Sequence, residues 1–246
     1  MPVFAGRKGP KMPRIRSISI FGDSILRGVV LNTETRRYSV SDCIGIDSIA
    51  DMYSIEITNH SRFGCTIERS YEYIRKHLAR GGRADAVLLE LGGNDCDFNW
   101  AEVAARPDAE HFPRTPIERF VSVYKAIIDT LRKQGIIPVL SNLPPLCPER
   151  YLDWVCRDGL DRERILGWLG SITAIYRFQE NYSRTVDCIA EEAGCKCIDL
   201  RGAFLRHRRV EQFFCEDGIH PNYAGQGLIR GALIDTLNNY KGVIYA

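Results

Sequence analysis

The stretch Ile18–Val29, ISIFGDSILRGV, decides the fold class of this chain. Its apolar residues are typical of a strand as far as Phe21. The strand pattern stops at Gly22-Asp23-Ser24, and a helical pattern follows. A serine at the start of a helix can cap a free backbone N–H group. It can also be a nucleophile, because α/β proteins gather functional groups at the carboxyl ends of their strands.

Five segments predict strands, and helical patterns separate them along the whole chain. The strand candidates are Ser17–Phe21, Ser54–Thr58, Ala86–Leu91, Ile136–Ser141 and Lys196–Leu200. Nearly continuous apolar runs in three of them are typical of parallel strands that helices cover on both faces. The sequence therefore predicts an α/β fold, a three-layer α/β/α sandwich around a parallel sheet of about five strands.

The predicted helices carry apolar residues at a spacing of three to four positions. They cover 67–78, 117–131, 172–189 and a final segment from Pro221 to about Asn239, whose proline suits a first helical turn. Two other segments, 95–116 and 144–161, are longer than a simple connection needs, and we expect them to be functional loops.

Composition and charge exclude several classes of protein. The formal net charge of +2 over 246 residues gives no strong case for a nucleic-acid partner. No stretch approaches the roughly 18 apolar residues of a membrane span, and the first residues lack the apolar segment of a secretory signal. We therefore expect a cytoplasmic protein, with a flexible basic arm at 1–16 and a single domain at 17–246. The sequence leaves the oligomeric state open.

The chain contains nine cysteines, an odd number with scattered spacing. Cys195 and Cys197 form a Cys-x-Cys pair, and no second pair completes a zinc site. We expect reduced, mostly buried thiols and no metal site.

Polar clusters follow the predicted strands at positions that belong on one edge of the sheet. They are Gly22–Ser24, His60–Cys65, Gly92–Asp95, Ser141–Pro144 and, ahead of the last helix, Asp217–Pro221. Because ligands bind at the carboxyl edge of parallel sheets, these clusters predict one site.

The residue types in these clusters suit ester hydrolysis. Ser24 can attack a carbonyl, His220 can take its proton, and Asp217 is close enough in sequence to orient the imidazole. The side-chain amide of Asn94 and the backbone N–H of Gly64 can stabilise the oxyanion that forms.

Four sequence blocks in this order resemble the SGNH hydrolase superfamily, the GDSL esterases and lipases. The blocks are FGDS around Ser24, Gly64 after the second strand, GGND around Asn94, and DGIHP with Asp217 and His220. The resemblance spans 17 to about 237 and implies a flavodoxin-like fold without a metal or organic cofactor. It also implies that Ser24 is the nucleophile, that His220 and Asp217 complete a triad, and that the N–H groups of Ser24 and Gly64 join the Asn94 amide in the oxyanion hole.

Each of these residues also has a purely structural interpretation. Ser24 and His220 can cap helices, and Asp217 and Asn94 can stabilise turns. Gly64 can be required only because its backbone adopts an angle that other residues disfavour. The occurrence of all four blocks in order favours catalysis.

The sequence thus predicts a serine esterase that removes short, acetyl-like acyl groups from a small or carbohydrate-like alcohol. An acyltransferase, a lysophospholipase or a thioesterase would use the same residues, and a non-catalytic acyl- or sugar-binding domain is a further alternative. The expected partner is a small-molecule ester. Trp100 and Trp154, in the two long segments, are candidates for its pocket, although a plain role as loop anchors fits them equally.

Overall fold

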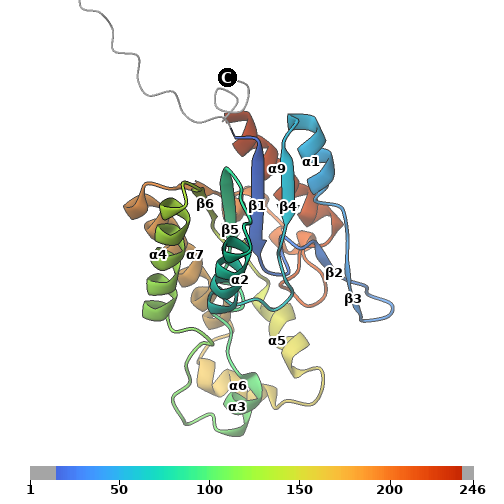
Figure 1. Ribbon diagram of the computed structural model, residues 1–246. Helices are drawn as coiled ribbons and strands as arrows, with labels where there is room; N and C mark the ends of the chain where they lie inside the picture. The colour runs from blue at the N-terminus through green and yellow to red at the C-terminus, as the bar shows by residue number, and fades with distance from the viewer. Residues whose placement is uncertain (1–14, 240–246) are drawn as a thin grey trace, which may run out of the picture.

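The computed structural model describes residues 15–239, and its centre is a five-stranded parallel sheet (Figure 1). The strands are β1 (Ser17–Gly22), β4 (Glu56–Asn59), β5 (Ala86–Glu90), β6 (Ile137–Ser141) and β7 (Lys196–Ile198). All five predicted strands are confirmed, with ends that move by a residue or two. Their order is β4-β1-β5-β6-β7, and every neighbouring pair is parallel. This flavodoxin-like order places a topological switch point between β1 and β5.

Helices cover both faces of the sheet, which confirms the three-layer α/β/α fold. They are α1 (Ile46–Tyr53), α2 (Ile67–Ala79), α3 (Trp100–Ala105), α4 (Ile117–Lys133), α5 (Pro148–Cys156), α6 (Arg162–Leu169), α7 (Thr173–Ala193), α8 (Leu200–Leu205) and α9 (Tyr223–Asn239), with a 3-10 turn at Val210–Phe213. Helices α2, α4 and α7 pack on one face, and α1, α8 and α9 pack on the other (Figure 1).

The core forms where apolar strands meet apolar helix faces. All residues of β5 are buried, and Leu89 meets the α4 stripe that includes Tyr124, Ile127 and Leu131. Burial of each such side chain contributes about 1.5–3 kcal/mol relative to exposure. Because the strands are fixed from both faces, the loops at their carboxyl ends start from rigid positions.

The segment after Ser24 differs from the prediction. The chain makes one hydrogen-bonded turn, in which the Val29 N–H donates to the Ser24 carbonyl at 3.0 Å, and then enters a short antiparallel hairpin. The hairpin consists of β2 (Val29–Leu31) and β3 (Tyr38–Val40). Gly28 ends the turn at a φ of 76°, and a Cβ there would lie 2.4 Å from the Ser41 carbonyl oxygen. The predicted helix at Ser24 is therefore wrong, and so is a helix cap as the role of this serine.

The two segments expected to be loops contain helices, so this expectation was also wrong in part. Helix α3 lies in 95–116 and α5 lies in 144–161, and both pack with α6 and the first turns of α7. Together these helices form a cap at the carboxyl end of the sheet, at the bottom of Figure 1. Buried residues of the cap include Phe98, Trp100, Leu152, Ile165 and Ile175.

The final helix begins two residues after the predicted proline. Pro221 pairs with Phe214 in an isolated β-bridge, and α9 starts at Tyr223. The side chain of Asn222 accepts a hydrogen bond from the Gly225 N–H at 3.1 Å, so it caps the helix. Helix α9 is described as far as Asn239, the last described residue, so the predicted end of the helix stays a prediction.

Most of the predicted N-terminal arm lies outside the described residues. Of its last two residues, Ile15 is buried against Ala86, and the N–H of Arg16 donates to Asp85 at 2.7 Å. The single domain at 17–246 stays a prediction. No helix within 15–239 is long and apolar enough to cross a membrane.

All nine cysteines are free, and only four of them are buried, fewer than expected. The buried ones are Cys65, Cys96, Cys147 and Cys215. No group of three or more metal-ligating side chains converges within residues 15–239.

Candidate active site

The polar clusters that follow the strands meet at the switch point of the sheet. Ser24 follows β1, Gly64 lies between β4 and α2, and Asn94 follows β5. Asp217 and His220 come from the loop ahead of α9. The structure thus brings all five predicted site residues to one cavity or its immediate wall.

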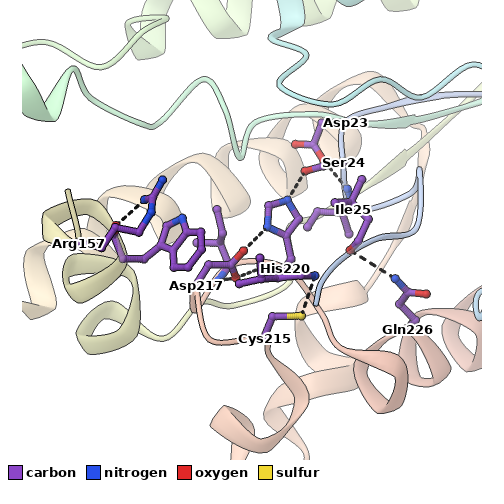
Figure 2. A network of polar contacts seen from close by, with 12 residues as sticks. Asp23, Ser24, Ile25, Arg157, Cys215, Asp217, His220 and Gln226 are labelled. Carbon is purple, nitrogen blue, oxygen red and sulfur yellow. Dashed lines mark hydrogen bonds and ion pairs between the residues drawn. The ribbon is translucent and has the colours of Figure 1, made fainter. Parts of the chain in front are cut away.

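Ser24, His220 and Asp217 form a continuous hydrogen-bonded chain (Figure 2). The Ser24 Oγ lies 2.9 Å from Nε2 of His220, and Nδ1 of the same imidazole lies 2.7 Å from Oδ2 of Asp217. These distances fall within hydrogen-bonding range, so each group can hold the next in orientation. An imidazole held in this way can accept the serine proton and later return it.

Asp217 is built to remain ionised although it is fully buried. Burial acts to raise the pKa of this carboxyl, but the hydrogen bond and charge of His220, together with two backbone donors, bring its pKa below the ordinary value. The donors are the N–H groups of Ile219 and His220, which bond Oδ1 at 3.1 and 3.0 Å. An ionised Asp217 favours the orientation of His220 in which Nε2 faces Ser24.

Three candidate N–H donors belong to residues that line the cavity beside the Ser24 hydroxyl, namely Ser24, Gly64 and Asn94. Within residues 15–239, the backbone N–H groups of Ser24 and Gly64 donate to no backbone carbonyl. Gly64 has a φ of 65°, a left-handed conformation that glycine adopts without strain. Asn94 Nδ2 donates one hydrogen bond to Asp23 at 3.0 Å, and its second N–H remains for a ligand.

A cavity of about 250 Å³ opens beside Ser24 and extends towards the cap. Its apolar walls include Phe98, Trp100, Leu143, Ile175 and Phe178. Of the two tryptophans predicted for the pocket, only Trp100 lines it.

Trp154 lies apart from the lining. Its ring stacks under the guanidinium of Arg157 at 4.0 Å, and its edge meets Tyr38 at 6.1 Å. Trp154 lies in α5, and its contacts with Arg157 and Tyr38 fit the interpretation as an anchor of this segment.

Two aromatic rings that the sequence did not predict for the site lie over His220. The Tyr38 ring centre is 5.0 Å from the imidazole, and Phe63 stacks on it at 5.8 Å with an interplanar angle of 10°. Tyr38 belongs to the unpredicted hairpin, and Phe63 precedes Gly64. The rings shield the imidazole from solvent on one side.

Burial disfavours the thiolate form of the two cysteines near the site, Cys65 and Cys96. Burial, with the nearby charges of Asp23 and Asp95, raises the pKa of Cys65 to about 12. Burial likewise raises the pKa of Cys96 well above its ordinary value. Because the thiolate is the reactive form, the raised pKa values favour a packing role for both side chains.

Residues 20–228 match the model of the GDSL-like lipase/acylhydrolase family. No individually curated protein matches the chain significantly.

Among solved structures, the chain is similar to a lipase/acylhydrolase from Enterococcus faecalis, with 19% identity, a TM-score of 0.62, and coverage of 92% of this chain and 96% of that chain. It is similar to a variant of an acetyl xylan esterase from Geobacillus stearothermophilus, with 15% identity, a TM-score of 0.61, and coverage of 92% and 95%. It is also similar to the esterase EstA from Pseudoalteromonas sp., with 16% identity, a TM-score of 0.57, and coverage of 92% and 98%. These likenesses show the fold, and the family match covers most of the chain. The chain belongs to the GDSL-like lipase/acylhydrolase family and is a hydrolase that acts on ester bonds.

Proposed function

We propose that the chain is a serine esterase that hydrolyses short, acetyl-like acyl esters of a small or carbohydrate-like alcohol. The single observation that supports this most strongly is the hydrogen-bonded chain from Asp217 through His220 to Ser24, at the mouth of an apolar cavity. Each of these residues also has a structural interpretation, but none of those requires the hydroxyl to face a cavity.

In the proposed reaction, Oγ of Ser24 attacks the ester carbonyl while Nε2 of His220 takes the hydroxyl proton. The carbonyl oxygen becomes an oxyanion, which the N–H groups of Ser24, Gly64 and Asn94 stabilise. The C–O bond to the alcohol breaks, and the imidazolium gives its proton to the leaving oxygen. Water, deprotonated by the same imidazole, then releases the acid from the acyl-enzyme.

The size of the cavity supports a short acyl group. Its volume of about 250 Å³ lies below the roughly 300–1,000 Å³ of pockets that hold drug-sized ligands. Two of the similar structures are acetyl xylan esterases, which agrees with a carbohydrate-like alcohol.

The Ser24→Ala variant tests the proposal with p-nitrophenyl acetate as substrate. We expect hydrolysis to fall to the background rate while circular dichroism stays that of the folded protein. Ser70→Ala is the matched control, because Ser70 is equally buried in α2 but lies outside the site. A folded Ser24→Ala variant with full activity would contradict the nucleophile. Rates across acetyl to palmitoyl esters test the substrate, and a maximum at long chains would contradict the short acyl group.

A further inference from the structure

Two carboxyl groups are buried directly behind the candidate site. Asp23 is 1% exposed and Glu90 is fully buried at the end of β5, beside Gly22 of β1 in the sheet register. The Asp23 N–H donates to Oε2 of Glu90 at 3.4 Å. No lysine or arginine within residues 15–239 forms an ion pair with either carboxyl. Two buried, adjacent negative charges without a cation are strongly unfavourable.

The pair avoids this cost by retaining a proton. Burial, the neighbouring Asp23 charge and the hydrogen bond shared with Asp23 hold the pKa of Glu90 well above its ordinary value. Burial raises the pKa of Asp23 as well, but hydrogen bonds from Ile25, Glu90 and Asn94 and the charge of His220 oppose that rise. The raised pKa of Glu90 makes it the carboxyl that retains the proton. Its Oε1 has no other hydrogen-bond partner within residues 15–239, which leaves that atom available for Asp23.

Asp23 connects this pair to the reacting groups. Its Oδ1 accepts the N–H of Ile25 at 2.8 Å, which shapes the turn that carries Ser24 (Figure 2). Its Oδ2 accepts Nδ2 of Asn94 at 3.0 Å, which aims the second N–H of this amide. The position of Asn94 thus depends on where the Asp23 carboxylate is held.

We propose that Glu90 is a positioning residue that acts through Asp23 on the amide of Asn94. The inference rests on the proposed function, in which Asn94 stabilises the oxyanion. A protonated Glu90 anchors Asp23, so that Asp23 presents Oδ2 to Asn94. Loss of the proton places two carboxylates side by side, and the hydrogen bond between them disappears. The amide then loses its fixed direction.

Other titratable groups face this pair and must be separated from it in a pH profile. Asp95 follows Asn94, Cys65 precedes α2, His220 precedes α9, and Tyr124 faces Glu90 from α4. Replacement of Glu90 by glutamine removes the titration of Glu90 and leaves the four other groups in place. Glutamine also keeps a donor for Asp23 and an acceptor for its N–H group.

The first experiment compares E90Q, E90M and the control Y124F by the pH dependence of p-nitrophenyl acetate hydrolysis. The control removes a buried hydroxyl that bonds the Leu89 carbonyl at 3.4 Å, next to Glu90 in β5. At pH 7 we expect E90Q and Y124F to remain within about threefold of the wild type, and kcat of E90M to fall about 10–100-fold at nearly constant KM. We also expect E90Q to lose an alkaline decline that Y124F retains. An E90Q variant as impaired as E90M at pH 7 overturns the proposal, and so does an unchanged alkaline decline.

The second experiment is a double-mutant cycle with N94A, whose kcat should fall by about 10²–10³. Because Glu90 acts through Asn94, E90M should change kcat by less than about threefold in the N94A background. The same factor in both backgrounds overturns the proposal.

Nuclear magnetic resonance of the Asn94 side-chain amide gives a readout that does not depend on activity. It therefore separates a change in the amide from a loss of activity that is due only to low stability of E90M. We expect the amide signals, assigned by their absence in N94A, to shift in E90M and to stay near the wild-type position in E90Q. Signals that do not move in a folded E90M overturn the proposal. If the wild type is inactive but the amide signals still shift in E90M, the proposed function is overturned and the coupling of Glu90 to Asn94 remains.

Discussion

Replacing Glu90 with glutamine tests the protonation of the buried carboxyl pair through folding stability alone. Burial and the Asp23 charge raise the pKa of Glu90 in the folded chain, whereas an unfolded glutamate has a pKa of about 4.3. Between these two values the folded protein holds a proton that the unfolded chain has released. The contribution of Glu90 to stability is therefore fully present below about pH 4.3 and is lost as the pH rises through the raised pKa.

The magnitude follows from one proton. A difference of one bound proton changes the free energy of unfolding by about 1.4 kcal/mol per pH unit. Glutamine has no proton to release, so the stability of E90Q relative to the wild type should rise with pH. Over the two units from pH 5.5 to 7.5, the rise should reach at most about 2.7 kcal/mol.

Urea unfolding at several pH values measures this difference. Tryptophan fluorescence and far-UV circular dichroism should give coincident transitions, so that each free energy is well defined. Tyr124→Phe is the matched control, because it removes a buried hydroxyl that bonds the Leu89 carbonyl and keeps both carboxyl groups. Parallel stability curves for E90Q and the wild type would refute the reasoning, since they would mean that Glu90 is ionised in the folded protein.

Three further predictions concern the triad, the cavity and the core. Asp217→Asn should lower kcat for p-nitrophenyl acetate by about 10³–10⁴ with the fold intact, as steady-state kinetics would show, because the imidazole loses its orientation; a fall below tenfold would contradict this role. Trp100→Phe should shift the preferred acyl length in an ester series, whereas Trp154→Ala should not, because only Trp100 lines the cavity; equal shifts would contradict the assignment. Leu131→Ala, at a fully buried position in α4, should cost about 2–5 kcal/mol in urea unfolding; a cost under 1 kcal/mol would contradict tight packing there.

The sheet could be predicted because its strands are buried on both faces. The run Ala86–Leu91 is apolar except for Glu90, and such a run has few alternatives to a central parallel strand. The same logic placed the polar clusters at one edge, and the structure brings Ser24 and His220 together across 196 positions of sequence.

The hairpin and the cap could not be predicted because their signals are local and weak. Strands β2 and β3 have three residues each, and β3 is exposed throughout. Helix α3 has only six residues and is held by packing against α6 rather than by its own apolar stripe. Tyr38 reaches His220 only through the position of this hairpin, so no spacing rule indicates it.

The sequence contains an indication of Glu90 that was not used in the prediction of the site. A single carboxyl within an apolar strand is unusual, because a buried charge is costly unless it is paired or protonated. The residues predicted for the site all follow the strands, whereas Glu90 lies inside a strand. Asp23 stabilises its own turn through the Ile25 N–H and also accepts a hydrogen bond from Asn94.

Labelling with a fluorophosphonate tests the central claim, a nucleophilic Ser24 activated by His220, most directly. Intact-mass spectrometry and peptide mapping should find one covalent adduct per chain, on Ser24. The adduct should be absent from Ser24→Ala and should form far more slowly in His220→Ala. A folded wild-type protein that stays unlabelled, or that carries the adduct on another serine, would contradict the account.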